Sequence, residues 1–281
     1  MSQEWRPLQL EGDDTDYDGL HEGIPTWLEP RFLEWIGRQM TTSQDGRTVY
    51  RAEQLHELEA RLRVALDWSR GGYSALGSLQ RYLPKDQEFF LQAIHFVLFQ
   101  TPRAADSVDK WLLAGGSAWT AKVRDGAAGL ERRVDDTIAA AADQVIVDAG
   151  RAGTHLARAW KAAYGRGPQP TVAYDESIKA VETAAIPTIS PRNDRATLGT
   201  LIRDLRAAPQ NFSVTLSALG GTDDVETVAR VMDLLWKGHP ARHGTPNPTR
   251  PSAASQSEAE AAAHLAVTLV HWFDKGFVSK R

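Results

Sequence analysis

Two arginines and two histidines stand in one proline-rich stretch, Lys237-Gly-His-Pro-Ala-Arg-His-Gly244, which continues to Ser252. An imidazole titrates near neutral pH, so it can take a proton from a ribose 2′-hydroxyl or return one to a leaving oxygen. A guanidinium can grip a phosphate through a fork of fixed donors. Arg242 and His243 are therefore the candidate catalytic residues for cutting RNA without a metal.

The same stretch carries a local surplus of positive charge. Between residues 230 and 250, four basic side chains face a single acid, Asp233. This surplus predicts that an anionic ligand would bind here first, with Lys237, His239 and Arg250 in support. The alternative is a loop with ordinary solvated charges, because this density of basic residues is not unusual.

A second segment with polar side chains at helical spacing accompanies the first. Asp175, Lys179 and Glu182 recur at intervals of four and three, which places them on one face of a helix. We expect that helix to pack beside the proline-rich stretch, so that Lys179 and Glu182 support the candidate site. In the structural alternative, Arg242 caps a helix end or pairs with Glu182 or Glu258.

No metal or cofactor is expected. His239 and His243 are four residues apart, but Pro240 breaks the helix that would align them on one metal ion. Zinc held by this pair with His264 or His271 remains an alternative. The glycine-rich phosphate and dinucleotide loops, the serine hydrolase motif and the zinc protease motif are all missing.

The composition is that of an ordinary globular protein, with 42% hydrophobic and 24% charged residues among 281. No apolar run approaches the roughly 20 residues that cross a bilayer, so no membrane association is expected. Residues 1–30 hold eight acidic side chains against Arg6, which disfavours a secretory signal and predicts a cytoplasmic protein. The absence of cysteine excludes disulfides, thiolate metal sites and a cysteine nucleophile.

Hydrophobic periodicity predicts an all-α fold. Apolar residues recur at intervals of three and four in most of the chain, and only the stretch 213–216 has strand character. Asp223 with Glu226, and Ser255 with Glu258, have the spacing of capping boxes that start two late helices.

Glycine and proline punctuation predicts the domain organisation. The strongest breaker is the segment 165–170, so we place the domain boundary there. The predicted parts are an acidic flexible tail at residues 1–22, a helical N-terminal domain at 23–165 and a helical bundle at 172–281.

Four segments in order carry a resemblance to a known family: Tyr174–Glu182, Ala196–Gly199, Ala241–Gly244 and Glu258–Ala266. Over about residues 172–275 the chain resembles the C-terminal HEPN-like helical domain of bacterial abortive-infection proteins. The helical N-terminal half is similar to that of uncharacterised bacterial and prophage proteins which carry such a domain.

The resemblance implies a four-to-five-helix bundle, often a homodimer, that takes part in defence against phage and is a ribonuclease in active members. Active members carry an arginine followed four to six residues later by a histidine. After Arg242 the corresponding positions hold Asn247, Pro248 and Thr249, whereas His243 directly follows the arginine. Either this pair works in a variant geometry, or the domain keeps the fold without cleavage.

The alternative function is a non-enzymatic HEPN-like module that binds a partner protein, a nucleotide or RNA. An oligomeric structural protein is a further alternative, because nine tryptophans provide material for interfaces between helices. Trp236 and Trp272 are the expected interface residues in that case.

Overall fold

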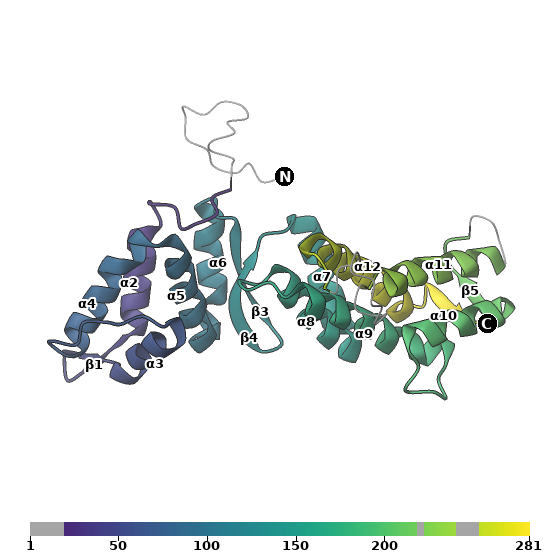
Figure 1. The fold of residues 1–281 in the computed structure, drawn as a ribbon, viewed down its shortest axis with the longest axis horizontal. Helices are drawn as coiled ribbons and strands as arrows, with labels where there is room; N and C mark the ends of the chain where they lie inside the picture. The colour runs from purple at the N-terminus through teal and green to yellow at the C-terminus, as the bar shows by residue number, and fades with distance from the viewer. Residues whose placement is uncertain (1–19, 218–221, 240–252) are drawn as a thin grey trace, which may run out of the picture. The chain divides into compact units, whose positions relative to one another are not determined.

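The computed structural model describes residues 20–217, 222–239 and 253–281 (Figure 1). The chain divides into two compact units, Met1–Arg133 and Val134–Arg281. Both units are predominantly α-helical, which confirms the expected fold class in its coarse form. Three two-stranded antiparallel sheets accompany the helices in the described ranges, and the sequence analysis did not predict them.

The N-terminal unit is built from short helices and two hairpins. In order, its elements are α2 (Glu29–Gln39), β1 (Thr41–Gln44), β2 (Arg47–Tyr50), α3 (Ala52–Leu62), α4 (Gly72–Tyr82), α5 (Gln87–Gln100), α6 (Ala105–Ala114), β3 (Trp119–Arg124) and β4 (Ala127–Arg132).

Helix α5 forms the centre of this unit because it is apolar around most of its circumference. Seven of its residues are buried, among them Phe90 and Ile94, which are fully enclosed. The side chain of Asp86 caps the helix by accepting the backbone N–H of Phe89 at 2.9 Å.

The antiparallel pair β3–β4 is a β-hairpin in a chain for which the sequence predicts an all-α fold. The chain turns through Asp125 and Gly126, both at positive φ (49° and 77°), which is the backbone that a tight hairpin turn requires. Arg124, next to the turn, forms a buried ion pair with Glu131 of the opposite strand, with Nε–Oε1 at 2.8 Å. Residues 119–132 therefore form a two-stranded sheet in a chain expected to be all-α.

Most of the predicted acidic tail, residues 1–19, lies outside the described residues. The rest of it is already structured, because the backbone N–H of His21 donates to the carbonyl of Gly116 at 2.8 Å. Ala118 N–H in turn donates to the carbonyl of His21, also at 2.8 Å. The ordered chain thus starts before Gly23.

Among its described residues, the C-terminal unit has six α-helices, which form a bundle, and one short two-stranded sheet. Its elements are α7 (Asp136–Asp148), α8 (Gly150–Tyr164), α9 (Pro170–Ile189), α10 (Leu198–Ala207), β5 (Phe212–Val214), α11 (Thr222–Gly238), α12 (Gln256–Asp274) and β6 (Val278–Lys280).

Helices α8 and α9 pack against each other through small side chains. Ala152, Ala159 and Ala163 of α8 are buried, as are Ala173 and Ala180 of α9. Alanine occupies little space, so the two backbones approach closely along the seam. This seam fixes which polar side chains of the two helices meet.

The domain boundary predicted between residues 165 and 172 is not where the units divide. The backbone N–H of Gln169 donates to the carbonyl of Ala162 at 2.7 Å, so this segment is a tight turn between two packed helices. The units divide between Arg133 and Val134 instead, and α7 and α8 belong to the C-terminal bundle. Glycine and proline occur at turns between helices within one domain as well as at boundaries between domains. The cluster of these residues therefore predicted the wrong place for the domain boundary.

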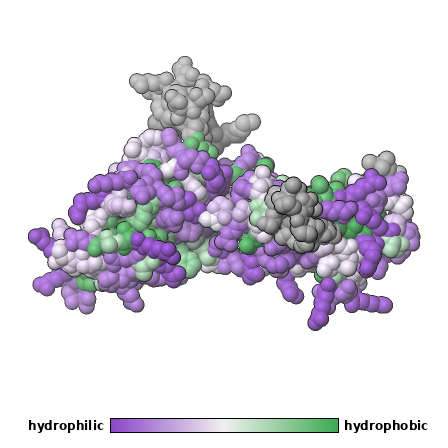
Figure 2. Space-filling view, in the orientation of Figure 1, coloured by the Kyte–Doolittle hydropathy of each residue, from purple (hydrophilic) through white to green (hydrophobic). Residues whose placement is uncertain are grey.

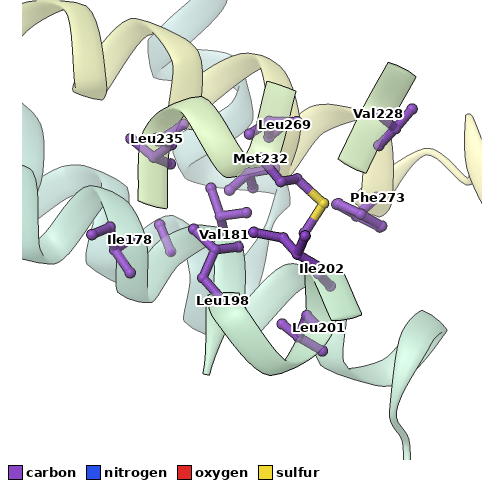
Figure 3. Packing of buried hydrophobic residues seen from close by; sticks show 14 of the residues in the cluster. Ile178, Val181, Leu198, Leu201, Ile202, Val228, Met232, Leu235, Leu269 and Phe273 are labelled. Atoms are coloured by element: carbon purple, nitrogen blue, oxygen red, sulfur yellow. The ribbon is translucent and has the colours of Figure 1, made fainter. Parts of the chain in front are cut away.

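The core of the bundle is apolar and formed by α9 to α12. Met232 of α11 is fully buried and lies between Ile202 of α10 and Phe273 of α12 (Figure 3). Val181 of α9 and Leu269 of α12 complete this layer. A core of this kind requires all four helices to be in place before any is protected from water.

The two predicted capping boxes have different outcomes. Ser255 and Glu258 form the box at the start of α12: the serine hydroxyl accepts the N–H of Glu258, and its carboxylate accepts the N–H of Ser255 at 2.8 Å. Helix α11 already includes Thr222, so Asp223 lies inside it and the predicted box there is wrong. Glu226 instead binds Arg206 of α10, with Nε–Oε2 at 3.1 Å.

None of the helices in the described ranges has the length and apolarity needed to span a bilayer. The face of the molecule in Figure 2 is mostly hydrophilic, with small and separate hydrophobic areas. That view therefore shows no single large apolar surface.

The capping box predicts a pH-dependent contribution to stability. Hydrogen bonds from the Ser255 backbone and hydroxyl lower the pKa of Glu258, so its stabilisation is complete above the ordinary glutamate pKa of about 4.3 and is lost as pH falls through the lowered value. We expect Glu258→Gln to lower the free energy of unfolding by about 0.5 to 1 kcal/mol at pH 7, measured by urea denaturation.

The control is Glu260→Gln in the same helix, because Glu260 accepts from the side chain of Gln256 rather than from the backbone. The difference between Glu258→Gln and the unmodified protein should close below pH 4. A gap that stays constant down to pH 3 contradicts the role of this carboxylate as a helix cap.

Candidate functional site

Some of the candidate residues lie at two places in the C-terminal unit. The others are among the residues that the structure does not describe. Arg242, His243 and Arg250 lie outside the described residues. Lys237 and His239 end the described part of α11, where the proline-rich stretch begins. Lys179 and Glu182 lie in the middle of α9.

His239 is buried against the start of α9. Only 8% of the residue is exposed, and its ring meets the ring of Tyr174 edge-on at a centroid distance of 5.1 Å. Its Nε2 lies 2.7 Å from Oδ1 of Asp175, but the angle is not that of a hydrogen bond, so the contact is an ion pair when the imidazole is protonated. His239 therefore anchors the stretch that follows it.

Tyr174 also holds the end of α11 in place. Its hydroxyl donates to the carbonyl of Leu235 at 3.0 Å. A side chain at Gly238 would come within 2.5 Å of this hydroxyl oxygen, so only glycine fits there. Burial raises the pKa of Tyr174, which keeps the hydroxyl a donor. The expected packing of the Asp175 helix beside the stretch thus holds at the first residue of the stretch.

Lys237 is held by its own helix. Its Nζ lies 2.6 Å from Oδ2 of Asp233, one turn earlier, and a hydrogen bond from Lys237 lowers the pKa of Asp233. The same carboxylate lies 3.5 Å from Nη1 of Arg206. Lys237 thus joins a charged network on α10 and α11 and is not brought together with His239.

A second polar cluster lies where α8 meets α9. Oε2 of Glu176 is 2.7 Å from Nδ1 of His155, and Oε1 is 2.6 Å from Nζ of Lys179. Contacts at 162 with 169 and at 155 with 176 show that the two helices run antiparallel, which brings His155 opposite Glu176. We call these three residues the α8–α9 cluster.

Electrostatics keep the central carboxylate of the cluster ionised. Burial alone would raise the pKa of Glu176, but hydrogen bonds from Lys179 and His155 outweigh it, so the pKa is lowered. A carboxylate bound to Nδ1 orients an imidazole, and the other ring nitrogen, Nε2, makes no hydrogen bond within the described residues. The His155 side chain is partly exposed to solvent.

Glu182 belongs to the same helix face but has another role. It accepts the backbone N–H of Leu198 at 2.6 Å and so holds the start of α10. Burial raises its pKa, although this N–H and the positive charges of Lys179 and His155 act in the opposite direction. The structure thus brings the predicted residues Lys179 and Glu182 near His155, which the sequence analysis did not single out.

His155 and Glu176 were missed because their pairing depends on the register between two helices. His155 is a polar residue within an alanine-rich apolar pattern, and this is the only signal that the sequence offers for it. Glu176 stands three residues before Lys179, a spacing that predicts a surface ion pair and not a buried one.

The zinc alternative finds no support in the described residues. His264 accepts or donates a hydrogen bond at 2.8 Å with the hydroxyl of Tyr164, which occupies its Nε2. The described ranges contain no group of three histidine, aspartate or glutamate side chains that could hold a metal ion.

The expected interface tryptophans pack on the bundle's own core. Trp236 and Trp272 are both partly buried against it. The ring of Trp236 lies directly over Gly199, where a side chain would come within 2.6 Å of its Nε1. Trp236 thus fills a place inside the bundle, and the role of the two rings in an interface between chains stays a prediction.

The α8–α9 cluster predicts opposite effects of pH for two carboxylates on one helix. The lowered pKa of Glu176 means that its stabilisation is present above about pH 4.3 and is lost as pH falls through the lowered value. Glu176→Gln should therefore lower the free energy of unfolding by about 1 to 2 kcal/mol at pH 7, with the difference closing in acid.

Glu182→Gln is the matched variant with the opposite sign. Because the pKa of Glu182 is raised, the ionised form weakens the fold, and that loss sets in as pH rises through the raised value. The neutral amide keeps an acceptor for Leu198, so this variant should be at least as stable as the unmodified protein at pH 7. Urea denaturation between pH 3 and 8 measures both; equal slopes for the two variants contradict the assignment.

Comparison of the chain with models of protein families, with curated proteins and with solved structures finds no match. The function is therefore argued from the residues of the chain itself.

Proposed function

We propose that the C-terminal unit is a HEPN-like bundle of the phage-defence type and acts as a metal-independent ribonuclease. Arg242 holds the scissile phosphate and His243 exchanges the proton. The observation that supports the proposal best is the burial of His239 against Asp175 and Tyr174: this histidine lies three positions before Arg242 in the sequence, so the chain is held in place shortly before both candidate residues. A catalytic loop needs a fixed base of this kind.

The chemistry needs no cofactor. The neutral imidazole of His243 takes the proton of the ribose 2′-hydroxyl, and the oxygen attacks the adjacent phosphorus while the bond to the 5′-oxygen breaks. The leaving oxygen takes up a proton, and the products are a 2′,3′-cyclic phosphate and a 5′-hydroxyl. Arg242 binds the phosphate oxygens, on which negative charge gathers in the transition state.

The hydrogen bonds that Glu182 and Glu258 accept also favour this function over the structural alternative. In that alternative, Arg242 pairs with one of these two carboxylates. Glu182 accepts from the backbone at the start of α10, and Glu258 does so at the start of α12. Both acids thus have a structural role that does not need the arginine.

The second candidate is a HEPN-like module that binds RNA or a protein partner without cleavage. One observation favours it: the described cations assigned a supporting role, Lys179 and Lys237, are each paired with a carboxylate. A site whose cations are already neutralised attracts a phosphate less strongly.

The test is cleavage of a labelled single-stranded RNA in the presence of a chelator, with and without extract of phage-infected cells. His243→Ala and Arg242→Ala should each lower the rate at least about 100-fold, because each removes a group that acts in the transition state. His271→Ala is the control, since His271 lies in α12 and contacts Phe277 edge-on.

The products separate the two candidates. A 2′,3′-cyclic phosphate that disappears with His243→Ala supports the ribonuclease, provided that helical circular dichroism is unchanged. RNA binding without cleavage supports the binding module. Cleavage that neither substitution affects contradicts the proposed roles of Arg242 and His243.

The proposal includes a homodimer, as in many HEPN-like proteins, so that two copies of the stretch share one cleft. Sedimentation equilibrium should then give a mass twice that of the 31.0 kDa chain. A single-chain mass throughout the micromolar range contradicts the dimer, and activity of such a monomer shows that one copy suffices.

A further inference from the structure

A groove of about 490 Å³ opens on the N-terminal unit, between the end of β2 and the outer face of α4. Its lining combines exposed aromatic and basic side chains with a helical glycine. Tyr50, Arg70, Tyr73, Gly77 and Arg81 carry the argument below, and we call them the tyrosine–arginine groove.

The two tyrosines form one wall of the groove. Their rings meet edge-on at a centroid distance of 6.2 Å, and Tyr73 is 62% exposed. Tyr50 supports it from β2 and closes over Gly72, where a side chain would come within 2.4 Å of the Tyr50 Cβ. The ring of Tyr73 is thus held in place by a neighbour while most of its surface stays open to a ligand.

Gly77 leaves the floor of the groove empty. Tyr73, Gly77 and Arg81 follow one another at intervals of four on α4, so they share one stripe of the helix. A side chain at Gly77 would meet only Nη1 of Arg81, at an ordinary contact distance of 3.5 Å. Glycine weakens the interior of a helix relative to alanine, and the protein's own packing does not require it here.

Two other glycines in helices of the chain have no room for a side chain. A side chain at Gly37 of α2 would come within 2.9 Å of Nε2 of Gln80, and one at Gly199 of α10 within 2.6 Å of Nε1 of Trp236. Those positions are closed by neighbours. The space above Gly77 is open, between an exposed aromatic ring and a guanidinium.

The charges on the groove are mixed, with a surplus of one cation. Arg70 and Arg81 are exposed, and their guanidinium groups make no hydrogen bond within the described residues. Asp67 also lines the groove. The hydrogen bond from the backbone N–H of Ser69 is the largest cause that lowers the pKa of Asp67, and the positive charges of the two arginines lower it further. Asp67 therefore opposes an anion that the arginines attract.

We propose that the tyrosine–arginine groove binds a nucleotide, with the base on the face of Tyr73 above Gly77 and the phosphate on Arg70 and Arg81. Aromatic rings and guanidinium groups in one groove are the two elements that hold single-stranded nucleic acid without reading its sequence. The volume of the groove fits a ligand of this size. The N-terminal unit thus holds RNA by a site that is separate from the chemistry proposed for Arg242 and His243.

The experiment uses the full chain with His243→Ala, so that a labelled RNA stays intact, and measures fluorescence anisotropy of a 12-nucleotide single strand at low salt. Tyr73→Ala should weaken binding about tenfold, because one stacked base is lost. Gly77→Leu should weaken it at least as much by filling the floor of the groove.

Two matched variants control for the fold. Tyr82→Ala removes another exposed tyrosine of α4, which contacts Phe89 edge-on and does not line the groove. Gly77→Ala improves the helix and adds only one methyl group. Tyr82→Ala should bind RNA like the parent chain, whereas Gly77→Ala should weaken binding less than Gly77→Leu because it fills less of the floor. All variants should keep the parent's thermal midpoint or exceed it except where a tyrosine is removed.

Two substitutions of charged residues test the proposal, because one should lower the affinity for RNA and the other should raise it. Arg81→Ala should lower affinity and reduce the slope of log affinity against log salt by about 0.7, the value for one contact with a single strand. Asp67→Asn removes the opposing charge but keeps an acceptor for Ser69, so it should tighten binding severalfold.

A free nucleoside monophosphate in competition distinguishes the source of the nucleotide. Displacement of the strand at millimolar concentration indicates a strand-binding groove, and displacement at micromolar concentration indicates a site for a free nucleotide. Equal binding by the parent chain, Tyr73→Ala and Gly77→Leu overturns the proposal. If the unmodified chain cleaves RNA but the groove variants bind RNA like the parent chain, the proposed ribonuclease is supported and the proposed nucleotide groove is contradicted.

Discussion

The close approach of α8 and α9 is the constraint on which the rest of the C-terminal unit depends. Alanine at their buried positions removes the bulk that would hold the backbones apart, so the two helices meet in one register. That register sets His155 against Glu176 and leaves Lys179 and Glu182 on the same side. A larger residue in the seam would therefore disturb both the packing and the electrostatics.

Buried charge in both units is stabilised by direct partners. Arg124 binds Glu131 at 2.8 Å in the hairpin of the N-terminal unit, and Glu176 has the side chains of Lys179 and His155 within 2.7 Å in the bundle. Glu182 accepts a backbone N–H instead, and burial raises its pKa. The contrast shows that the side-chain partners of Glu176 outweigh the effect of burial on the pKa, whereas the backbone N–H at Glu182 does not.

Sequence patterns predicted the helices well and their contacts poorly. Periodicity and capping identify α5 and α12, since both signals lie within a few neighbouring residues. The hairpin β3–β4 was missed because Asp125 and Gly126 form a short turn that an all-α interpretation passed over. His155 with Glu176, and Tyr73 with Tyr50, join segments far apart along the chain, and no local pattern reveals which partner each will meet.

The pairing of β5 with β6 has a consequence for folding during synthesis. Ser213 and Ser279 lie opposite each other with their hydroxyl oxygens 2.9 Å apart, although 66 positions separate them along the chain. Val278, which is almost fully enclosed, reaches the core of the bundle through this pairing. Strand β5 therefore cannot pair until the chain has been synthesised as far as Lys280, so this sheet is a non-local contact that closes late.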